Sequence, residues 1–322
     1  MNNLANKEKR LPREIWVAAI SLYGLWPEQT MANRMKNIIR RMECVFPFQP
    51  DIICLPETMN ISWVKEVKSL QEIAEDETTP GPVTSQMAEI AKKQNCYIIC
   101  PIVTKKDSRY YNSSILINRK GKIDGVFHKV HPTDAEILPE KFYKGGGVTP
   151  GTLKPPVFKT DFGTIGLQIC MDASWYDSWG SLKADGAEIV FFSSQAGYGN
   201  ILNNHAWMNH YNIVSSTGPD ARIIDMTGNV VAGDGEFARW TCAPLNLEKV
   251  LIHIWPQVNK FEAIQKKYGR KIGIKIDHPE NWVTIESLDP EIKVRDILKE
   301  FNLPTYDEQI AEATLIQEKY RK

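Results

Sequence analysis

Apolar residues in this chain occur either in short unbroken runs or at every third or fourth position. Predominantly apolar runs at 15–22, 51–55 and 96–103 predict buried strands. Helical spacing of apolar residues predicts helices at 28–46 and 83–94. Strands and helices that alternate in this way are typical of an α/β fold.

The middle of the chain continues the pattern with a predicted hairpin, formed by strands at 111–118 and 123–126. A proline- and glycine-rich segment at 133–151 follows, and a loop of this length is usually functional or mobile. An apolar strand at 165–169 then leads into a predicted helix at 173–185. Further strands are predicted at 188–193, 212–217, 221–225, 229–232 and 250–255, with a short helix at 203–209.

Three reactive side chains stand where predicted strands end. Glu57 follows the strand at 51–55, Lys129 follows the hairpin, and Cys170 follows the strand at 165–169. Each has an ordinary structural explanation on its own, as a surface carboxylate, a solvated cation or a small buried thiol. Ligand crevices of α/β folds lie beyond the carboxyl ends of strands, so the three together favour a shared site. A helix N-terminus beside Cys170 would favour its thiolate.

Composition narrows the possible partners. Lysine and arginine total 39, as do aspartate and glutamate, which leaves no basic field for nucleic acid or an anionic membrane. No apolar run is long enough to cross a bilayer, and residues 1–14 lack the apolar region of a secretion signal. We therefore expect a cytoplasmic protein with reduced cysteines. His128 and His131 have no third ligand at usable spacing, so we expect neither a metal nor a cofactor.

Taken in order, the motifs around these three residues resemble those of the nitrilase, or carbon–nitrogen hydrolase, superfamily. They read Asp51-Ile-Ile-Cys-Leu-Pro-Glu57, Val126-Phe-His-Lys129-Val-His131 and Gly166-Leu-Gln-Ile-Cys170-Met-Asp172. The resemblance covers residues 15–255. It implies an α-β-β-α four-layer sandwich of the nitrilase superfamily type that carries a Glu-Lys-Cys triad.

The same resemblance implies the roles of individual residues. Cys170 would be the nucleophile, Glu57 the general base, and Lys129 with the backbone N–H of Met171 the oxyanion site. Many members use a second glutamate after the lysine. Glu140 matches that pattern better than Glu136, because it precedes a basic and aromatic pair.

Several positions depart from the family pattern and leave the substrate open. Met171 stands where relatives usually carry tryptophan or tyrosine. Four aromatic residues are predicted to line an acyl pocket, although aromatic side chains serve equally well in a core. They are Phe142, Trp175, Tyr176 and Tyr198.

We divide the chain into a leader at 1–14, a hydrolase domain at 15–255 and an extension at 256–322 that contains a helix at 307–321. The extension is expected to pack on another subunit of a homo-oligomer, a dimer or higher.

The predicted activity is hydrolysis of a linear amide or N-carbamoyl compound through a cysteine thioester. The alternatives are a nitrilase, a non-catalytic homologue that binds a metabolite or scaffolds a partner, and a papain-type hydrolase that would use His205 or His210.

Overall fold

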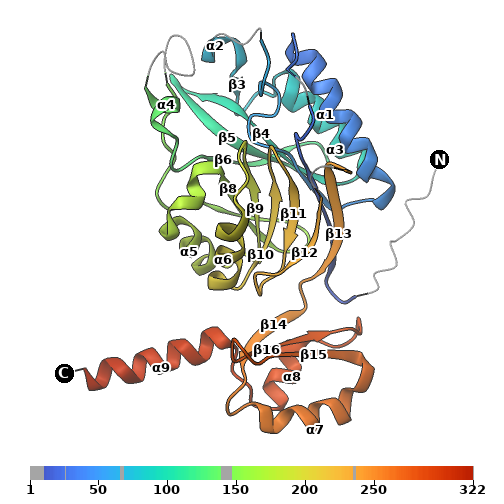
Figure 1. The fold of residues 1–322 in the computed structure, drawn as a ribbon, viewed down its shortest axis with the longest axis vertical. Helices are drawn as coiled ribbons and strands as arrows, with labels where there is room; N and C mark the ends of the chain where they lie inside the picture. Colours follow the sequence, from blue (N-terminus) through green and yellow to red (C-terminus); the bar gives the residue numbers. More distant parts are fainter. Residues whose placement is uncertain (1–10, 26, 66–68, 139–146, 235–236, 322) are drawn as a thin grey trace. The chain divides into compact units, whose positions relative to one another are not determined.

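The computed structural model describes residues 11–25, 27–65, 69–138, 147–234 and 237–321 of the chain. These residues form two compact units (Figure 1). The larger unit is residues 16–243, and the smaller combines residues 11–15 with 244–321. Among the described residues, no helix has both the length and the apolar character needed to cross a bilayer.

Two sheets stack in the larger unit. In spatial order, the first contains β13 (Trp240–Asn246), β1 (Glu14–Ile20), β2 (Ile52–Cys54), β4 (Tyr97–Lys106), β5 (Arg109–Ile117) and β6 (Ile123–His128), with β3 (Glu75–Asp76) paired to β4. The second contains β12 (Val230–Asp234), β11 (Ala221–Ile224), β10 (Asn212–Ser216), β9 (Ile189–Ser193), β8 (Thr164–Ile169) and β7 (Val157–Lys159). The strands β1, β2 and β4 run parallel, as do β8, β9 and β10.

The two sheets meet along their central strands, because β2 lies against β9 and β10. The Ser193 hydroxyl on β9 donates to the carbonyl oxygen of Leu55 at 2.8 Å and so joins the layers. Helices cover both outer faces (Figure 1): α1 (Met31–Val45) and α3 (Pro82–Gln94) on one side, α5 (Tyr176–Ala184) and α6 (Gly199–Asn209) on the other. This arrangement confirms the predicted α-β-β-α sandwich.

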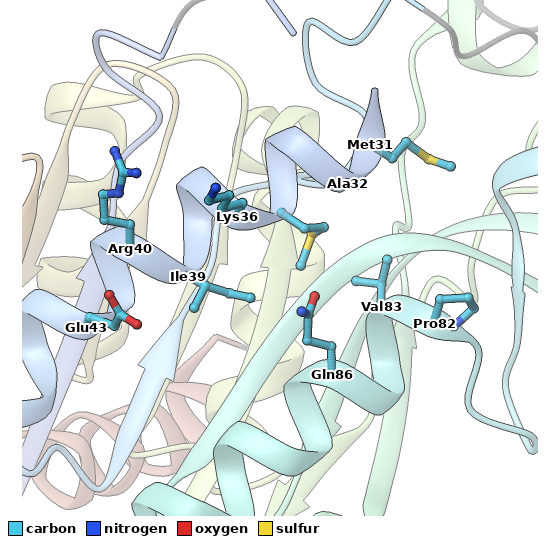
Figure 2. A pocket seen from close by; sticks show the side chains of 10 residues that line it. Met31, Ala32, Lys36, Ile39, Arg40, Glu43, Pro82, Val83 and Gln86 are labelled. Atoms are coloured by element: carbon cyan, nitrogen blue, oxygen red, sulfur yellow. The ribbon is translucent and has the colours of Figure 1, made fainter. Parts of the chain in front are cut away.

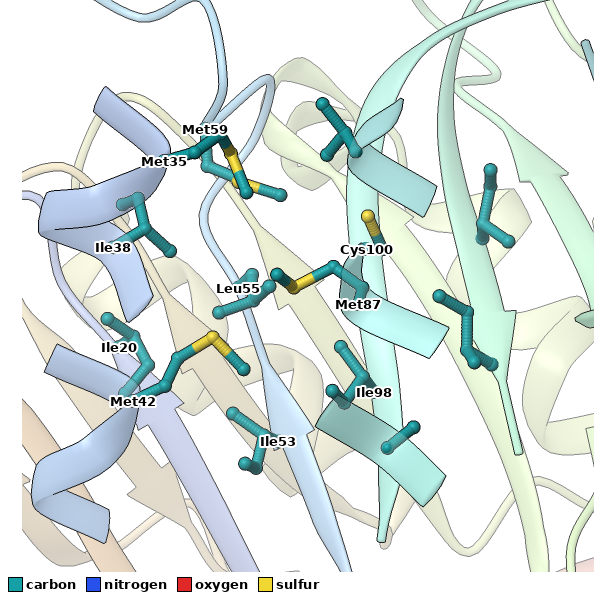
Figure 3. Packing of buried hydrophobic residues seen from close by; sticks show 14 of the residues in the cluster. Ile20, Met35, Ile38, Met42, Ile53, Leu55, Met59, Met87, Ile98 and Cys100 are labelled. Carbon is teal, nitrogen blue, oxygen red and sulfur yellow. The ribbon is translucent and has the colours of Figure 1, made fainter. Parts of the chain in front are cut away.

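The apolar face of α1 explains why this helix packs on the first sheet. The Thr30 hydroxyl caps its N-terminus by accepting from the N–H of Asn33. From the following turns, Ile38 and Met42 point toward Met87 of α3 and the aliphatic side chains of the sheet (Figure 3). Ile38, Met42 and Met87 are fully buried. The helix is therefore held by apolar burial on one face.

A cavity of 740 Å³ lies between α1 and α3 on the outer side of this layer (Figure 2). Its apolar lining comes from residues such as Met35 and Ile39, and Lys36, Arg40 and Glu43 are exposed at its edge.

The smaller unit has a core of its own. A sheet of β14 (Lys249–His253), β16 (Trp282–Ser287) and β15 (Ile272–Asp277) packs with α7 (Val258–Tyr268) and α8 (Val294–Glu300). The buried members of this core include Ile252, Phe261, Val283 and Ile297. The helix α9 (Tyr306–Tyr320) confirms the predicted terminal helix, and residues before it build this core.

Substitution of Met42 tests the packing of α1. We expect Met42→Ala to lower the free energy of unfolding by about 2–5 kcal/mol, because it leaves a cavity in a buried cluster. Lys36→Ala on the exposed side of the same helix is the control and should change it by less than about 0.5 kcal/mol. Denaturant unfolding measures both, and equal effects would contradict this packing.

Candidate active site

The three residues predicted at strand ends line one cavity of 490 Å³ in the larger unit. Glu57 follows β2, Lys129 follows β6, and Cys170 follows β8 of the second sheet. Strands from both sheets therefore deliver these side chains to the same space. The other lining residues are Thr58, Ile61, Ser62, Trp63, Val64, Asn112, Thr133, Glu136 and Gln195.

The Lys129 ammonium lies between two carboxylates. Its Nζ is 2.8 Å from Glu57 Oε1 and 2.8 Å from Glu136 Oε2, and its side chain is 1% exposed. The Asn112 amide donates to Glu57 at 2.8 Å and to Glu136 at 2.7 Å. Burial alone would lower the pKa of Lys129, but the two carboxylates outweigh burial and raise it. The lysine is therefore a permanent cation that carries its charge into a buried site.

Glu136, which matches the family pattern less well than Glu140, accepts a hydrogen bond from Lys129. It lies in the short helix α4 (Asp134–Ile137), which begins with a capping box in which Thr133 and Glu136 bond reciprocally. Burial would raise the pKa of Glu136, but Lys129 lowers it below its ordinary value. Glu140, the predicted second glutamate, lies outside the described residues. The Thr133-x-x-Glu136 spacing is a capping-box signature and could have drawn attention to Glu136.

Gln195 holds the other oxygen of the Glu57 carboxylate. The backbone N–H of Gln195 donates to Glu57 Oε2 at 3.0 Å. Its side-chain amide donates to the Glu57 carbonyl oxygen and, at 2.5 Å, to the Ser62 hydroxyl. Both oxygens of Glu57 are thus engaged, so the orientation of this carboxylate is fixed.

Cys170 sits in a tight turn rather than directly before a helix. Its φ of +49° lies in the left-handed region, which is strained for a residue with a side chain. A 3-10 turn covers Cys170–Ser174, and α5 begins at Tyr176, three residues after the start of the helix predicted at 173–185.

The buried Asp172 carboxylate fastens this turn. One oxygen accepts from the Ile169 N–H at 3.0 Å, and the other accepts from the His131 N–H at 2.7 Å. The His131 ring stacks on Trp175 at a centroid separation of 4.2 Å. Because His131 follows Lys129 by two residues, Asp172 connects the cysteine turn to the segment that carries the lysine.

The thiol of Cys170 is protonated in the resting site. Burial and the negative charge of Glu57 raise its pKa, and Lys129 only partly opposes them. The sulfur also lies 3.9 Å from the Tyr198 hydroxyl, which is 3.8 Å from Met171 Sδ. Burial and Cys170 raise the pKa of Tyr198 as well, so its hydroxyl keeps its proton. A thiol of this kind needs a base to become a nucleophile.

The other predicted pocket residues are spread around this turn. Tyr198 is half-buried beside the thiol, whereas Trp175 stacks on His131 and Tyr176 is 67% exposed near the His205 ring. Phe142 lies outside the described residues. None of the three described aromatics is among the residues that line the cavity.

The histidine of the papain-type alternative serves a structural role. The His205 ring is buried, stacks on Trp179 at 4.1 Å and contacts the Ala173 carbonyl oxygen at 2.8 Å. His210, the second candidate, ends α6 with a φ of +52°. Neither lines the cavity that contains Cys170.

Comparison with known families decides the assignment. The family model described as carbon–nitrogen hydrolase matches residues 17–251. The chain belongs to the carbon–nitrogen hydrolase family. The resemblance inferred from the three motifs is thereby confirmed.

Curated relatives of this carbon–nitrogen hydrolase match over parts of their length. A nitrilase and fragile histidine triad fusion protein from Drosophila melanogaster is 31% identical over 175 residues, which are 53% of this chain and 37% of the relative. An N-carbamoylputrescine amidase from Arabidopsis thaliana is 30% identical over 36% of this chain and 38% of its own. A β-ureidopropionase from the same plant is 31% identical over 44% of this chain and 34% of its own. The chain thus spans less than half the length of these relatives.

Solved structures share the fold of this carbon–nitrogen hydrolase. Saccharomyces cerevisiae Nit3, a member of branch 10 of the nitrilase superfamily, superposes with a TM-score of 0.62 at 20% identity over 81% of this chain and 96% of its own. An amidase from Nesterenkonia sp. superposes with a TM-score of 0.60 at 13% identity over 75% of this chain and 93% of its own.

Neutralising Glu57 tests the electrostatics of the site. The Glu57 charge raises the pKa of the Cys170 thiol, so Glu57→Gln should lower that pKa while Lys129 continues to favour the thiolate. At a fixed mildly alkaline pH, the variant should therefore hold more thiolate than the wild type. A pH titration of ultraviolet thiolate absorbance, corrected with Cys170→Ala for the other cysteines, measures the shift. An unchanged or higher pKa would contradict the assigned geometry.

Proposed function

We propose that this carbon–nitrogen hydrolase cleaves the C–N bond of a linear amide or N-carbamoyl compound through a thioester on Cys170. The observation that carries the proposal is the Lys129 ammonium, held between Glu57 and Glu136 in the cavity that Cys170 lines. The names of two relatives, an N-carbamoylputrescine amidase and a β-ureidopropionase, support the amide class over the nitrile class.

In the first half of the reaction, Glu57 takes the thiol proton as sulfur bonds to the carbonyl carbon. The carbonyl oxygen becomes an oxyanion, which the Lys129 ammonium and the backbone N–H of Met171 stabilise. Collapse of this intermediate breaks the C–N bond, and Glu57 returns the proton to the departing nitrogen. Ammonia or an amine leaves, and the acyl group stays on sulfur.

In the second half, Glu57 takes a proton from water as the water oxygen bonds to the thioester carbon. The C–S bond then breaks and the proton returns to sulfur. The product is a carboxylic acid from an amide, or from an N-carbamoyl compound a carbamic acid that breaks down to an amine and CO2. The same carboxylate thus acts as base and acid in turn, which requires the fixed position that Gln195 gives it.

Removal of the nucleophile tests this mechanism. Cys170→Ala should abolish ammonia release from a panel of amides, carbamoyl compounds and nitriles, and should leave the thermal unfolding temperature nearly unchanged. Cys44→Ala, at an exposed cysteine, is the control and should keep full activity. Retained turnover in Cys170→Ala would refute the role of the thiol, and release of ammonia from nitriles but not from the matching amides would identify a nitrilase.

Two matched variants test which glutamate supports the lysine. Glu136→Gln removes one of the two charges that hold Lys129, so we expect kcat to fall by about a hundredfold through misplacement of the ammonium. Glu140→Gln should change kcat by far less. Steady-state kinetics with the best amide of the panel compares them, and the reverse order of effects would restore the role that the sequence motif suggests for Glu140.

A further inference from the structure

The loop from Thr58 to Val64 forms an apolar wall of the active-site cavity. Ile61, Trp63 and Val64 of this loop all line the cavity. Among the described residues, the charged members of the lining are Glu57, Lys129 and Glu136, and Lys129 pairs with both carboxylates. A substrate that enters therefore meets charged side chains that already pair with one another at the end near Cys170. Along this loop it meets an apolar surface.

Trp63 is the unusual member of the wall. Its side chain is 67% exposed although it borders a cavity, and its φ of +61° lies in the left-handed region. A large aromatic residue rarely adopts this conformation, and such outliers cluster at ligand-binding sites. The exposed ring thus presents an apolar face that the fold of the free protein leaves uncovered.

The backbone of Trp63 is held in this conformation from both sides. Its carbonyl oxygen accepts from the Glu28 N–H at 2.9 Å, and the Glu28 carbonyl oxygen accepts from the Lys65 N–H at 3.0 Å. Within the loop, the Val64 N–H donates to the Ile61 carbonyl oxygen at 3.1 Å. The strained position is therefore built into the loop.

The wall is also joined to the reacting end of the cavity. Gln195 donates its side-chain amide both to the Ser62 hydroxyl and to the Glu57 carbonyl oxygen. The Ser62 hydroxyl in turn donates to the Thr58 carbonyl oxygen at 2.8 Å. The position of the Trp63 loop is thus set relative to the carboxylate assigned as the base.

We propose that Trp63 determines specificity by covering an apolar group attached to the scissile amide. The inference rests on the proposed function and narrows its substrate class to neutral amides with an aliphatic or aromatic substituent. A ureido compound with a free carboxylate or ammonium at its far end would place that charge against Trp63 and its apolar neighbours. None of the charged lining residues that the structure describes is free to pair with it there, so the charge would lose water without compensation from them.

Kinetics with four probes test the proposal: acetamide, hexanamide, N-carbamoyl-β-alanine and N-carbamoylputrescine. We expect the wild type to prefer hexanamide. Trp63→Ala should raise KM for hexanamide by about tenfold or more, because its longer chain reaches the ring. The KM for acetamide, which does not reach the ring, should change by less than about twofold. Trp63→Phe should keep the KM for hexanamide close to that of the wild type. Trp207→Ala, outside the cavity, should change KM for neither amide.

Two outcomes overturn the inference. One is an equal effect of Trp63→Ala on acetamide and hexanamide, and the other is a wild-type preference for either charged carbamoyl compound.

Ligand-observed NMR titration of hexanamide into Cys170→Ala separates this inference from the proposed function. If addition of Trp63→Ala weakens hexanamide binding by at least about tenfold, the result supports the role of Trp63. If the wild type then turns over none of the probes, only the proposed function fails. Binding that is absent, or that does not depend on Trp63, overturns the inference.

Discussion

The site depends on the burial of one cation, the Lys129 ammonium. A buried charge without partners is strongly destabilising, so this side chain requires opposite charges around it. Glu57 and Glu136 supply them, and Asn112 donates to both carboxylates and so relieves the repulsion between them. The ends of β2 and β6 and the start of α4 must therefore converge on one point, with Asn112 of β5 between them. The order of strands in the first sheet brings these segments together.

The charges around Lys129 also support the proposed role of Cys170 as a nucleophile, although its thiol has a raised pKa. Two carboxylates and one ammonium leave one net negative charge beside Cys170, which disfavours a second anion on sulfur. In the proposed reaction, transfer of the thiol proton to Glu57 removes that excess charge at the moment when sulfur needs to become negative. The ammonium is then free of one carboxylate and can stabilise the oxyanion that develops on the substrate.

Sequence patterns predicted the layers of the fold and the strand ends that carry Glu57, Lys129 and Cys170, because buried strands have a strong apolar signal. They predicted that the strand before Cys170 leads into a helix, but not the 3-10 turn between the two. That turn depends on Asp172, which accepts from His131, 41 residues earlier in the chain, and such a bond leaves no local signal. Glu136 was passed over for a related reason. The position of Glu136 depends on the cap of α4 and on the bond from Lys129. The family motif, in contrast, is defined by the residues that directly follow the glutamate.

Gln195 connects Glu57, the proposed base, to the loop that carries Trp63. One residue orients the Glu57 carboxylate through its N–H and ties down the loop that carries Trp63 through its side chain. The position of the base and the position of the wall are therefore set together. A substrate that pushes the wall outward also displaces the base, and small displacements of a catalytic group lower the rate strongly. In the proposed mechanism, a poorly fitting substrate therefore loses rate as well as affinity, and selectivity in kcat/KM exceeds what the contact with Trp63 alone provides.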